Sequence, residues 1–270
     1  MHPDLFQIGP IHIKAYGLAL AISFFVGVWL AAARAKKQNL NSQVVIDLSF
    51  IVLVAALAGS RLFYVVYHTE EFAGHWLDAI NPFQSSGEVG IAGLSMMGGV
   101  ILAIVAIMMY FIIRRTYPWP VVDIMAPSFL LGLGITRIGC FFNGCCFGLP
   151  TKTGLGIIFP GDSMAGWVFP RIPLWPTQLL ESAAGFVMFG TALLLEKKKS
   201  FHGYTFWIVI MMYSVWRFAI DFMRYYEDSM VLFSIGNVGI SRNQFLSLSL
   251  FGIALVWFVV FKRRYGETTR

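Results

Sequence analysis

Apolar runs of about 20 residues recur along the chain, and they restrict its fold more than any other feature. A run of this length crosses the hydrocarbon core of a bilayer as an α-helix. We expect seven spans, at roughly 15–34, 44–66, 91–113, 120–141, 176–195, 203–223 and 244–261. The sequence therefore predicts an all-α polytopic membrane protein, with residues 1–270 forming a single integral membrane domain.

The composition excludes most other classes of protein. Charged residues make up only 13% of the chain, and hydrophobic residues make up 57%. Soluble domains carry about 25% charged residues, so an ordinary soluble enzyme, a coiled coil and a disordered chain are excluded. A membrane β-barrel is disfavoured because its strands alternate in polarity and lack long apolar runs.

The positions of the basic residues predict the orientation in the membrane. If the spans alternate, 12 of the 20 lysines and arginines lie on one side. They are Arg34, Lys36, Lys37, Arg114, Arg115, Lys197, Lys198, Lys199, Lys262, Arg263, Arg264 and Arg270. Basic loops face the cytoplasm, so we expect the N-terminus outside and the C-terminus inside. The net charge of +6 is then a topology signal, and no nucleic-acid partner is expected.

The longer loops are expected on the outer side. They cover about 67–90, 142–175 and 224–243, whereas the inner loops are short. Loops on a rigid scaffold often carry function. We therefore expect the functional site to face outward.

Three arginines remain inside the expected spans: Arg61, Arg137 and Arg217. Each lies toward the outer end of its span. A charge in a span is costly, and the planar fork of arginine suits phosphate, so one hypothesis is a shared anionic ligand such as a phospholipid headgroup. The alternative is that each arginine reaches the outer headgroups or pairs with a local acid.

Span six carries a polar stripe. Tyr213, Arg217, Asp221 and Arg224 are spaced so that they share one face of a helix. Arg217 is expected to pair with Asp221, and Asp221 with Arg224. The stripe either orients the helix or holds Arg217 in place for a headgroup.

Two further segments lie at the outer ends of spans. In span five, Gln178 and Glu181 follow Trp175 and Pro176 and share a face, which fits either a site or a helix start with an interfacial tryptophan. The segment 90–99 opens span three with four glycines, including Gly98 and Gly99. Such glycines either expose N–H donors to an anion or allow close helix packing.

The segment from Thr136 to Gly148 is the most distinctive. It joins Arg137 to Asn143 and contains the only cysteines, Cys140, Cys145 and Cys146. Adjacent cysteines bridge poorly. No histidine or further cysteine lies nearby to complete a zinc set, so we expect no metal site.

At these residues the chain resembles the phosphatidylglycerol–prolipoprotein diacylglyceryl transferase family over nearly its whole length. The most specific match is Arg137-Ile-Gly139 followed by Asn143-Gly144. The other matches, in chain order, are Lys14, Tyr16, Gly17, Gly59, Arg61, Gly93, Ser95, Gly98, Gly99, Gly148, Pro176, Gln178, Glu181, Tyr213 and Arg217.

The resemblance implies transfer of the diacylglyceryl group of phosphatidylglycerol to the lipobox cysteine of a prolipoprotein, with release of glycerol phosphate and no cofactor. It implies a multi-pass protein of the bacterial cytoplasmic membrane, with the active site at the outer leaflet. The expected catalytic residues are Arg137, Arg217, Tyr16 and Tyr213. The expected substrate-binding residues are Arg61, Met97, Gly98, Gly99, Asn143, Gly148, Gln178, Glu181, Asp221 and Arg224.

The chain departs from the family pattern where a base is expected. Met97 and Trp175 stand where the family often has histidine, and Cys140 and Cys145 stand where it often has asparagine and glutamate. Methionine cannot accept a proton. Either no base is needed, or another group such as Glu181 or His68 serves, or the acceptor differs.

Two other functions stay open at the level of sequence. A transporter would show paired repeats and broken helices at the middle of the bilayer, and the chain shows no repeat. A phospholipid-binding protein without transferase activity would use the same arginines.

Overall fold

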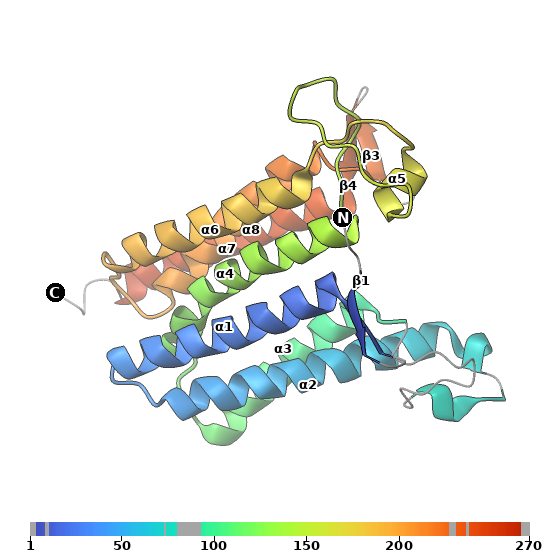
Figure 1. The fold of residues 1–270 in the computed structure, drawn as a ribbon. Coiled ribbons are helices and arrows are strands. Elements are labelled where there is room, and N and C mark those ends of the chain that lie inside the picture. The colour runs from blue at the N-terminus through green and yellow to red at the C-terminus, as the bar shows by residue number, and fades with distance from the viewer. Residues whose placement is uncertain are drawn as a thin grey trace. The chain divides into compact units, whose positions relative to one another are not determined.

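The computed structural model describes residues 4–8, 11–72, 74–79, 93–226, 231–235 and 238–265. Figure 1 shows long helices joined by loops and short hairpins. The long helices are α1 (Ala15–Lys37), α2 (Ser42–Tyr67), α3 (Met96–Arg114), α4 (Trp119–Asn143), α6 (Thr177–Glu196), α7 (Tyr204–Asp221) and α8 (Arg242–Tyr265). The short elements are α5 (Met164–Val168), η1 (Thr69–Phe72), η2 (Trp76–Ala79) and the hairpins β1 (Asp4–Ile8)–β2 (Ile11–Lys14) and β3 (Val231–Ile235)–β4 (Val238–Ser241).

The all-α class is confirmed, and each expected span coincides with one long helix. Six of these helices are long and apolar enough to cross a membrane, while α7 is not among them. The charged residues Arg217 and Asp221 lie within α7 and lower its hydropathy. The count of seven spans therefore stays a prediction, as do the side of each terminus and the single-domain organisation.

The start of span three differs from the expected position. The helix begins at Met96, whereas the expected span began at 91. Gly93 has a φ of 76°, and Ser95 is an extended residue before the helix, so the chain is not yet helical there. Residues 90–92 of the glycine-rich segment, and residues 73 and 80–90 of the loop expected at 67–90, lie outside the described residues.

The contacts divide the chain into two compact units, which are described separately. The second unit comprises Ile8–Ile11 and Ala32–Val121 and is built on the packing of α2 against α3. Gly59 and Gly98 allow this approach: a Cβ on Gly98 would lie 2.3 Å from the Gly59 carbonyl oxygen. Small residues of this kind let membrane helices pack backbone to backbone.

The first unit comprises Met1–Gln7, His12–Ala31 and Val122–Arg270. Its core lies between α4, α6 and α7, where Leu130, Met188 and Val209 are buried together. Ser182 Oγ donates to the Gly134 carbonyl at 2.8 Å, which ties α6 to α4. In lipid, helix association relies on such packing and hydrogen bonds because the hydrophobic effect is weak.

The loop after α4 has a small core of its own. Phe147, Phe159 and Leu174 are buried and pack with Phe169 and Tyr225. Phe147 stacks on Tyr225 with ring centroids 5.5 Å apart. This loop of the first unit is therefore a folded cap and joins the segment that follows α7.

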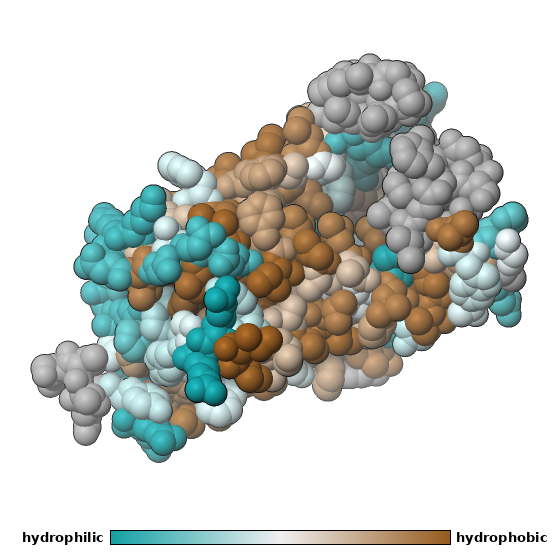
Figure 2. Space-filling view, turned by 90° about the horizontal axis from the view of Figure 1, so that it is seen from below, coloured by the Kyte–Doolittle hydropathy of each residue, from teal (hydrophilic) through white to brown (hydrophobic). Residues whose placement is uncertain are grey.

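The exposed side chains of the long helices are mainly apolar. On α2 and α3, Val54, Val66 and Ile113 are more than 60% exposed. Figure 2 shows hydrophobic side chains gathered over the middle of the face it views, with hydrophilic ones toward its ends. Large exposed apolar surface on helices of this length is that of a multi-pass membrane protein.

Candidate active site

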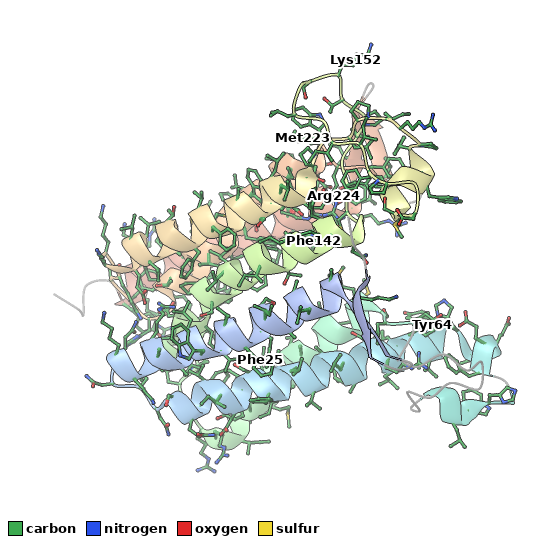
Figure 3. The ribbon with its side chains drawn as sticks, in the orientation of Figure 1. Phe25, Tyr64, Phe142, Lys152, Met223 and Arg224 are labelled. Carbon is green, nitrogen blue, oxygen red and sulfur yellow. The ribbon has the colours of Figure 1, made fainter. Side chains whose placement is uncertain are left out.

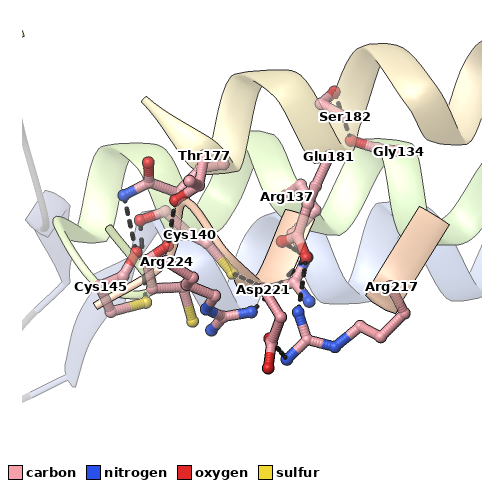
Figure 4. A network of polar contacts seen from close by, with 12 residues as sticks. Gly134, Arg137, Cys140, Cys145, Thr177, Glu181, Ser182, Arg217, Asp221 and Arg224 are labelled. Carbon is pink, nitrogen blue, oxygen red and sulfur yellow. Dashed lines mark hydrogen bonds and ion pairs between the residues drawn. The ribbon is translucent and has the colours of Figure 1, made fainter. Parts of the chain in front are cut away.

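Glu181 is the centre of the site in the first unit. Its Oε2 lies 2.7 Å from Arg137 Nε, and its Oε1 lies 3.1 Å from Arg217 Nη1 and 3.5 Å from Arg224 Nη1. Figure 4 shows these side chains converging from α4, from the first turns of α6, and from the end of α7. One buried carboxylate thus positions three guanidinium groups from three segments.

A second carboxylate fixes Arg217 from the other side. Asp221 Oδ1 lies 3.1 Å from Arg217 Nη2, so the expected i, i+4 pair is confirmed. The expected pair of Asp221 with Arg224 is wrong: Arg224 turns to Glu181 instead, because the chain leaves the helix after Asp221. Tyr226 accepts from Arg217 and donates to Asp221, and Ser241 also donates to Asp221.

Burial raises the pKa of Tyr226, which follows α7. The phenol therefore stays protonated at neutral pH and keeps its hydrogen bond to Asp221. Because the phenol is neutral, it does not cancel the positive charge of Arg217.

The cluster Arg137, Arg217 and Arg224, here called the arginine cluster, carries a surplus of positive charge. Three guanidinium groups face two carboxylates, Glu181 and Asp221, which leaves one excess positive charge. The carboxylate side chains are 3% and 0% exposed, whereas the arginine side chains are 10–16% exposed. The acids therefore lie behind the arginines, and the arginines reach the accessible side, where an anion would be bound.

The segment after Arg137 is held by the start of α6. Thr177 Oγ1 donates to the Cys146 carbonyl and Gln178 Nε2 donates to the Cys145 carbonyl, both at 2.8 Å. Thr177 and Gln178 are fully buried. The expected site residue Gln178 therefore fixes the loop backbone. Hydrogen bonds from the neighbouring thiols, together with the arginines nearby, lower the pKa of the Cys146 thiol.

Gly148 joins three segments of the first unit. Its N–H donates to the Trp175 carbonyl at 3.0 Å, and it pairs with Arg224 in an antiparallel bridge. A Cβ at this position would lie 2.6 Å from Trp175 Cβ and 2.7 Å from the Met223 carbonyl oxygen. Figure 3 shows Met223 and Arg224 beside this loop, and Lys152 at its far tip. Gly148 thus brings Arg224 to the site.

Both expected tyrosines lie close enough to Arg137 to interact with it electrostatically. Tyr16 is 38% exposed at the start of α1, where Gly139 lets α1 approach α4. Tyr213 is half-buried on α7, one turn before Arg217, and packs edge-on against Phe129 of α4. Asn143 ends α4, and its side chain contacts Cys145.

The remaining expected residues belong to the second unit. Arg61 is buried; its Nε donates to the Ala79 carbonyl at 2.8 Å and its Nη1 to the Gly93 carbonyl at 3.2 Å. Its guanidinium also lies 5.0 Å from the Phe72 ring centroid. Arg61 therefore fixes the loop between α2 and α3. Gly98 and Gly99 lie in the α2–α3 contact, while Met97 is 67% exposed at the start of α3.

Comparisons with known proteins identify the family. A sequence model of the prolipoprotein diacylglyceryl transferase family matches residues 3–260. The chain belongs to this family. A phosphatidylglycerol–prolipoprotein diacylglyceryl transferase of Prochlorococcus marinus (strain NATL2A) is 31% identical over 236 residues, which are 82% of this chain and 78% of the relative.

Two relatives of the same name match over more of the chain. The protein of Clostridium botulinum (strain 657 / Type Ba4) is 30% identical over 261 residues, 97% of this chain and 98% of its own. That of Pseudoalteromonas atlantica is 30% identical over 270 residues, 98% and 92% respectively. The resemblance read from the motifs is therefore confirmed for the prolipoprotein diacylglyceryl transferase family.

Within this family member, the sequence pattern missed three buried polar residues. Tyr226 and Ser241 complete the shell of Asp221, but Tyr226 lies in the loop after α7 and Ser241 ends the short strand β4, so no periodicity marked them. Asp123 is fully buried in α4 and accepts from the N–H groups of Gly203 and Phe206 at the start of α7. An acidic residue inside an apolar span is the signal that could have found Asp123.

Proposed function

We propose that this chain transfers the diacylglyceryl group of phosphatidylglycerol to the cysteine thiol of a prolipoprotein lipobox. Membership of the prolipoprotein diacylglyceryl transferase family supports the reaction and the two substrates. The observation that carries the proposal is the arginine cluster, with its one excess positive charge in front of buried carboxylates.

The arginine cluster suits the leaving group of this reaction. The acceptor sulfur forms a bond to the glyceryl carbon while the bond from that carbon to the phosphate oxygen breaks. Negative charge grows on the departing glycerol phosphate, and fixed cations stabilise it. In this proposal Arg137 and Arg217 bind the phosphate. Arg224 joins them, since its Nε has no hydrogen-bond partner among the described residues.

The other residues of the first unit have supporting roles in this proposal. Tyr16 and Tyr213 would orient the headgroup beside Arg137 and Arg217. Glu181, Asp221, Gln178 and Gly148 hold the cations and the loop backbone in position. Fixing charged groups before the substrate arrives lowers the reorganisation needed in the transition state.

Glu181 is poorly suited to be the missing base. Its carboxylate contacts three arginines, so accepting a proton would cost those ion pairs. The ring of His68 stacks on Tyr64 in the second unit and stays a candidate. A reaction without a protein base also stays open, because arginines stabilise a thiolate.

The proposed location is the bacterial cytoplasmic membrane, with the site at the outer leaflet. Support comes from the basic residues at the helix ends that lie away from the arginine cluster, such as Lys197–Lys199 after α6. Phosphatidylglycerol and the membrane-anchored acceptor would then reach the arginine cluster from the bilayer.

The test is turnover by the purified full-length protein with phosphatidylglycerol and a lipobox peptide. We expect a thioether product and release of glycerol phosphate, both abolished in Arg137→Ala. The matched control is Lys152→Ala, because Lys152 is an exposed cation at the tip of the loop. Absence of product beside an active family enzyme would contradict the proposal, and phosphatidylglycerol binding without turnover would favour a binding protein.

A further inference from the structure

The cysteine cluster, Cys140, Cys145 and Cys146, brings the three sulfurs of the chain together. All three Sγ atoms lie within 4.8 Å of one another. Cys140 is in the last turn of α4, and the other two follow the turn at Gly144. Side chains of adjacent extended residues point to opposite sides. Cys146 has a φ of 63°, and this bend lets both sulfurs approach Cys140.

Buried polar side chains fix the backbone of the cluster. The Cys145 and Cys146 carbonyls accept from Gln178 and Thr177, which are fully buried. The Cys145 N–H donates to the Cys140 carbonyl at 3.2 Å. Residues that hold metal ligands in place are bonded in this way by a second layer of polar groups. The cysteine cluster is thus rigidly supported.

We propose that the cysteine cluster binds a soft divalent metal ion such as Zn²⁺ through three thiolates and leaves a fourth coordination position for an external thiol. Thiolates select soft metal ions. Zn–S bonds of about 2.3 Å place tetrahedral sulfurs about 3.8 Å apart, so no pair of sulfurs must close by more than about 1 Å. Small rotations about the cysteine Cα–Cβ bonds supply that movement. The sequence argued against zinc because no fourth protein ligand completes the set, and in this proposal an external thiol takes that position.

The charges around the cluster favour the loaded site. Three thiolates and one divalent ion carry one excess negative charge. Arg137 Nη1 lies 3.9 Å from Cys140 Sγ and can compensate it. The arginines would repel a bare cation, but they stabilise the anionic thiolate complex.

The open position gives the site a chemical use. Among the described residues no histidine or carboxylate joins the three sulfurs. A zinc ion with three protein ligands takes a water or substrate as its fourth. A thiol bound to zinc loses its proton, which passes to solvent.

A zinc-bound thiol would serve the reaction proposed above, and this part of the inference rests on that proposed function. The bound acceptor thiolate would form the bond to the glyceryl carbon, and glycerol phosphate would leave with the electron pair of the broken C–O bond. The metal ion would then replace the base that Met97 cannot supply.

The metal site is tested with Co²⁺ added to the reduced, metal-free full-length protein in detergent. We expect sulfur-to-cobalt charge-transfer absorption that saturates at one equivalent and is displaced by Zn²⁺. Zinc should also protect all three thiols from a thiol reagent. Cys146→Ser should weaken cobalt binding at least about a hundredfold, and Thr177→Val at least about tenfold.

The control variant is His75→Ala, which removes an exposed potential ligand outside the cluster and should leave cobalt binding unchanged. Absent charge-transfer absorption, or an unchanged affinity in Cys146→Ser, would overturn the metal site. If Cys146→Ser does not fold, the thiol-protection result on the unsubstituted protein decides.

The open position is tested without phosphatidylglycerol, so the result does not depend on turnover. A lipobox peptide with its cysteine should shift the cobalt spectrum, and the same peptide with serine in its place should not. An identical spectrum with both peptides would overturn the open position. A shifted spectrum in a protein that forms no thioether product would support this site and contradict the proposed transferase.

Discussion

At the scale of single residues, the site depends on the geometry of its arginines as well as on their charge. Arg217 uses Nη1 for Glu181 and Nη2 for both Asp221 and Tyr226. These directed contacts from both terminal nitrogens fix the plane of the guanidinium group. Lysine has a single ammonium group and cannot reproduce two directed contacts.

We therefore expect Arg217→Lys to lose at least about a hundredfold in kcat/KM, since a lost charged hydrogen bond in the transition state costs about 3 kcal/mol. The measurement is the initial rate of glycerol phosphate release at lipid concentrations well below saturation, where the rate is proportional to kcat/KM. Lys152→Arg is the matched control, because it exchanges the same two residue types at the exposed loop tip. Activity close to that of the unsubstituted protein would show that charge alone suffices.

At the scale of elements, the loop after α4 is a structural part of the site. Gly148 allows the contact between this loop, Trp175 and Met223. Gly148→Ala should separate the loop from the segment after α7 and misplace Arg224. We expect at least about a tenfold loss of activity with unchanged helix content by circular dichroism.

Gly154→Ala is the control for this loop, because a Cβ at Gly154 meets nothing within 4 Å. If Gly148→Ala kept full activity, the loop contact would not be needed to position Arg224.

The start of α7 depends on Asp123. This buried carboxylate accepts from Gly203 and Phe206 and pairs with Lys199 at 2.9 Å. Asp123→Ala leaves these donors unpaired and should destabilise the fold by about 3 kcal/mol. We expect a lower thermal midpoint in detergent and unchanged turnover per folded molecule, because Asp123 is not part of the site.

The exposed Asp162 provides the control for this prediction, since Asp162→Ala removes an acid from the surface. Equal thermal midpoints for the two variants would contradict the role of Asp123.

The periodicity of the sequence predicted the helices well, because an apolar run of span length has one solution in lipid. It also singled out Arg137 and Arg217, since charges in spans are costly, and Glu181 by its spacing from Gln178. It could not predict that Glu181 joins three arginines, because that contact depends on how α4, α6 and α7 pack. Nor could it predict that Cys146 turns toward Cys140, because the turn depends on a single backbone angle.

At the scale of the whole molecule, the question is whether α7 crosses the membrane. Its hydropathy does not place it among the six candidate spans. Yet its first residues are capped by Asp123, near the start of α4, and Arg217 in its last turns binds Glu181, near the start of α6. The starts of α4 and α6 lie at opposite ends of their packed pair. Helix α7 therefore extends along the whole length of α4 and α6.

This geometry supports the prediction of seven spans and fixes a test of topology. With seven spans and the N-terminus outside, the C-terminal segment with Lys262, Arg263 and Arg264 is cytoplasmic, as the positive-inside rule requires. A fluorescent protein fused after residue 270 should therefore fluoresce, and alkaline phosphatase fused at the same position should be inactive. A dark fluorescent protein with active phosphatase would mean an even number of spans or an inverted chain. An inverted chain would turn the arginine cluster toward the cytoplasm and would contradict the proposed site at the outer leaflet.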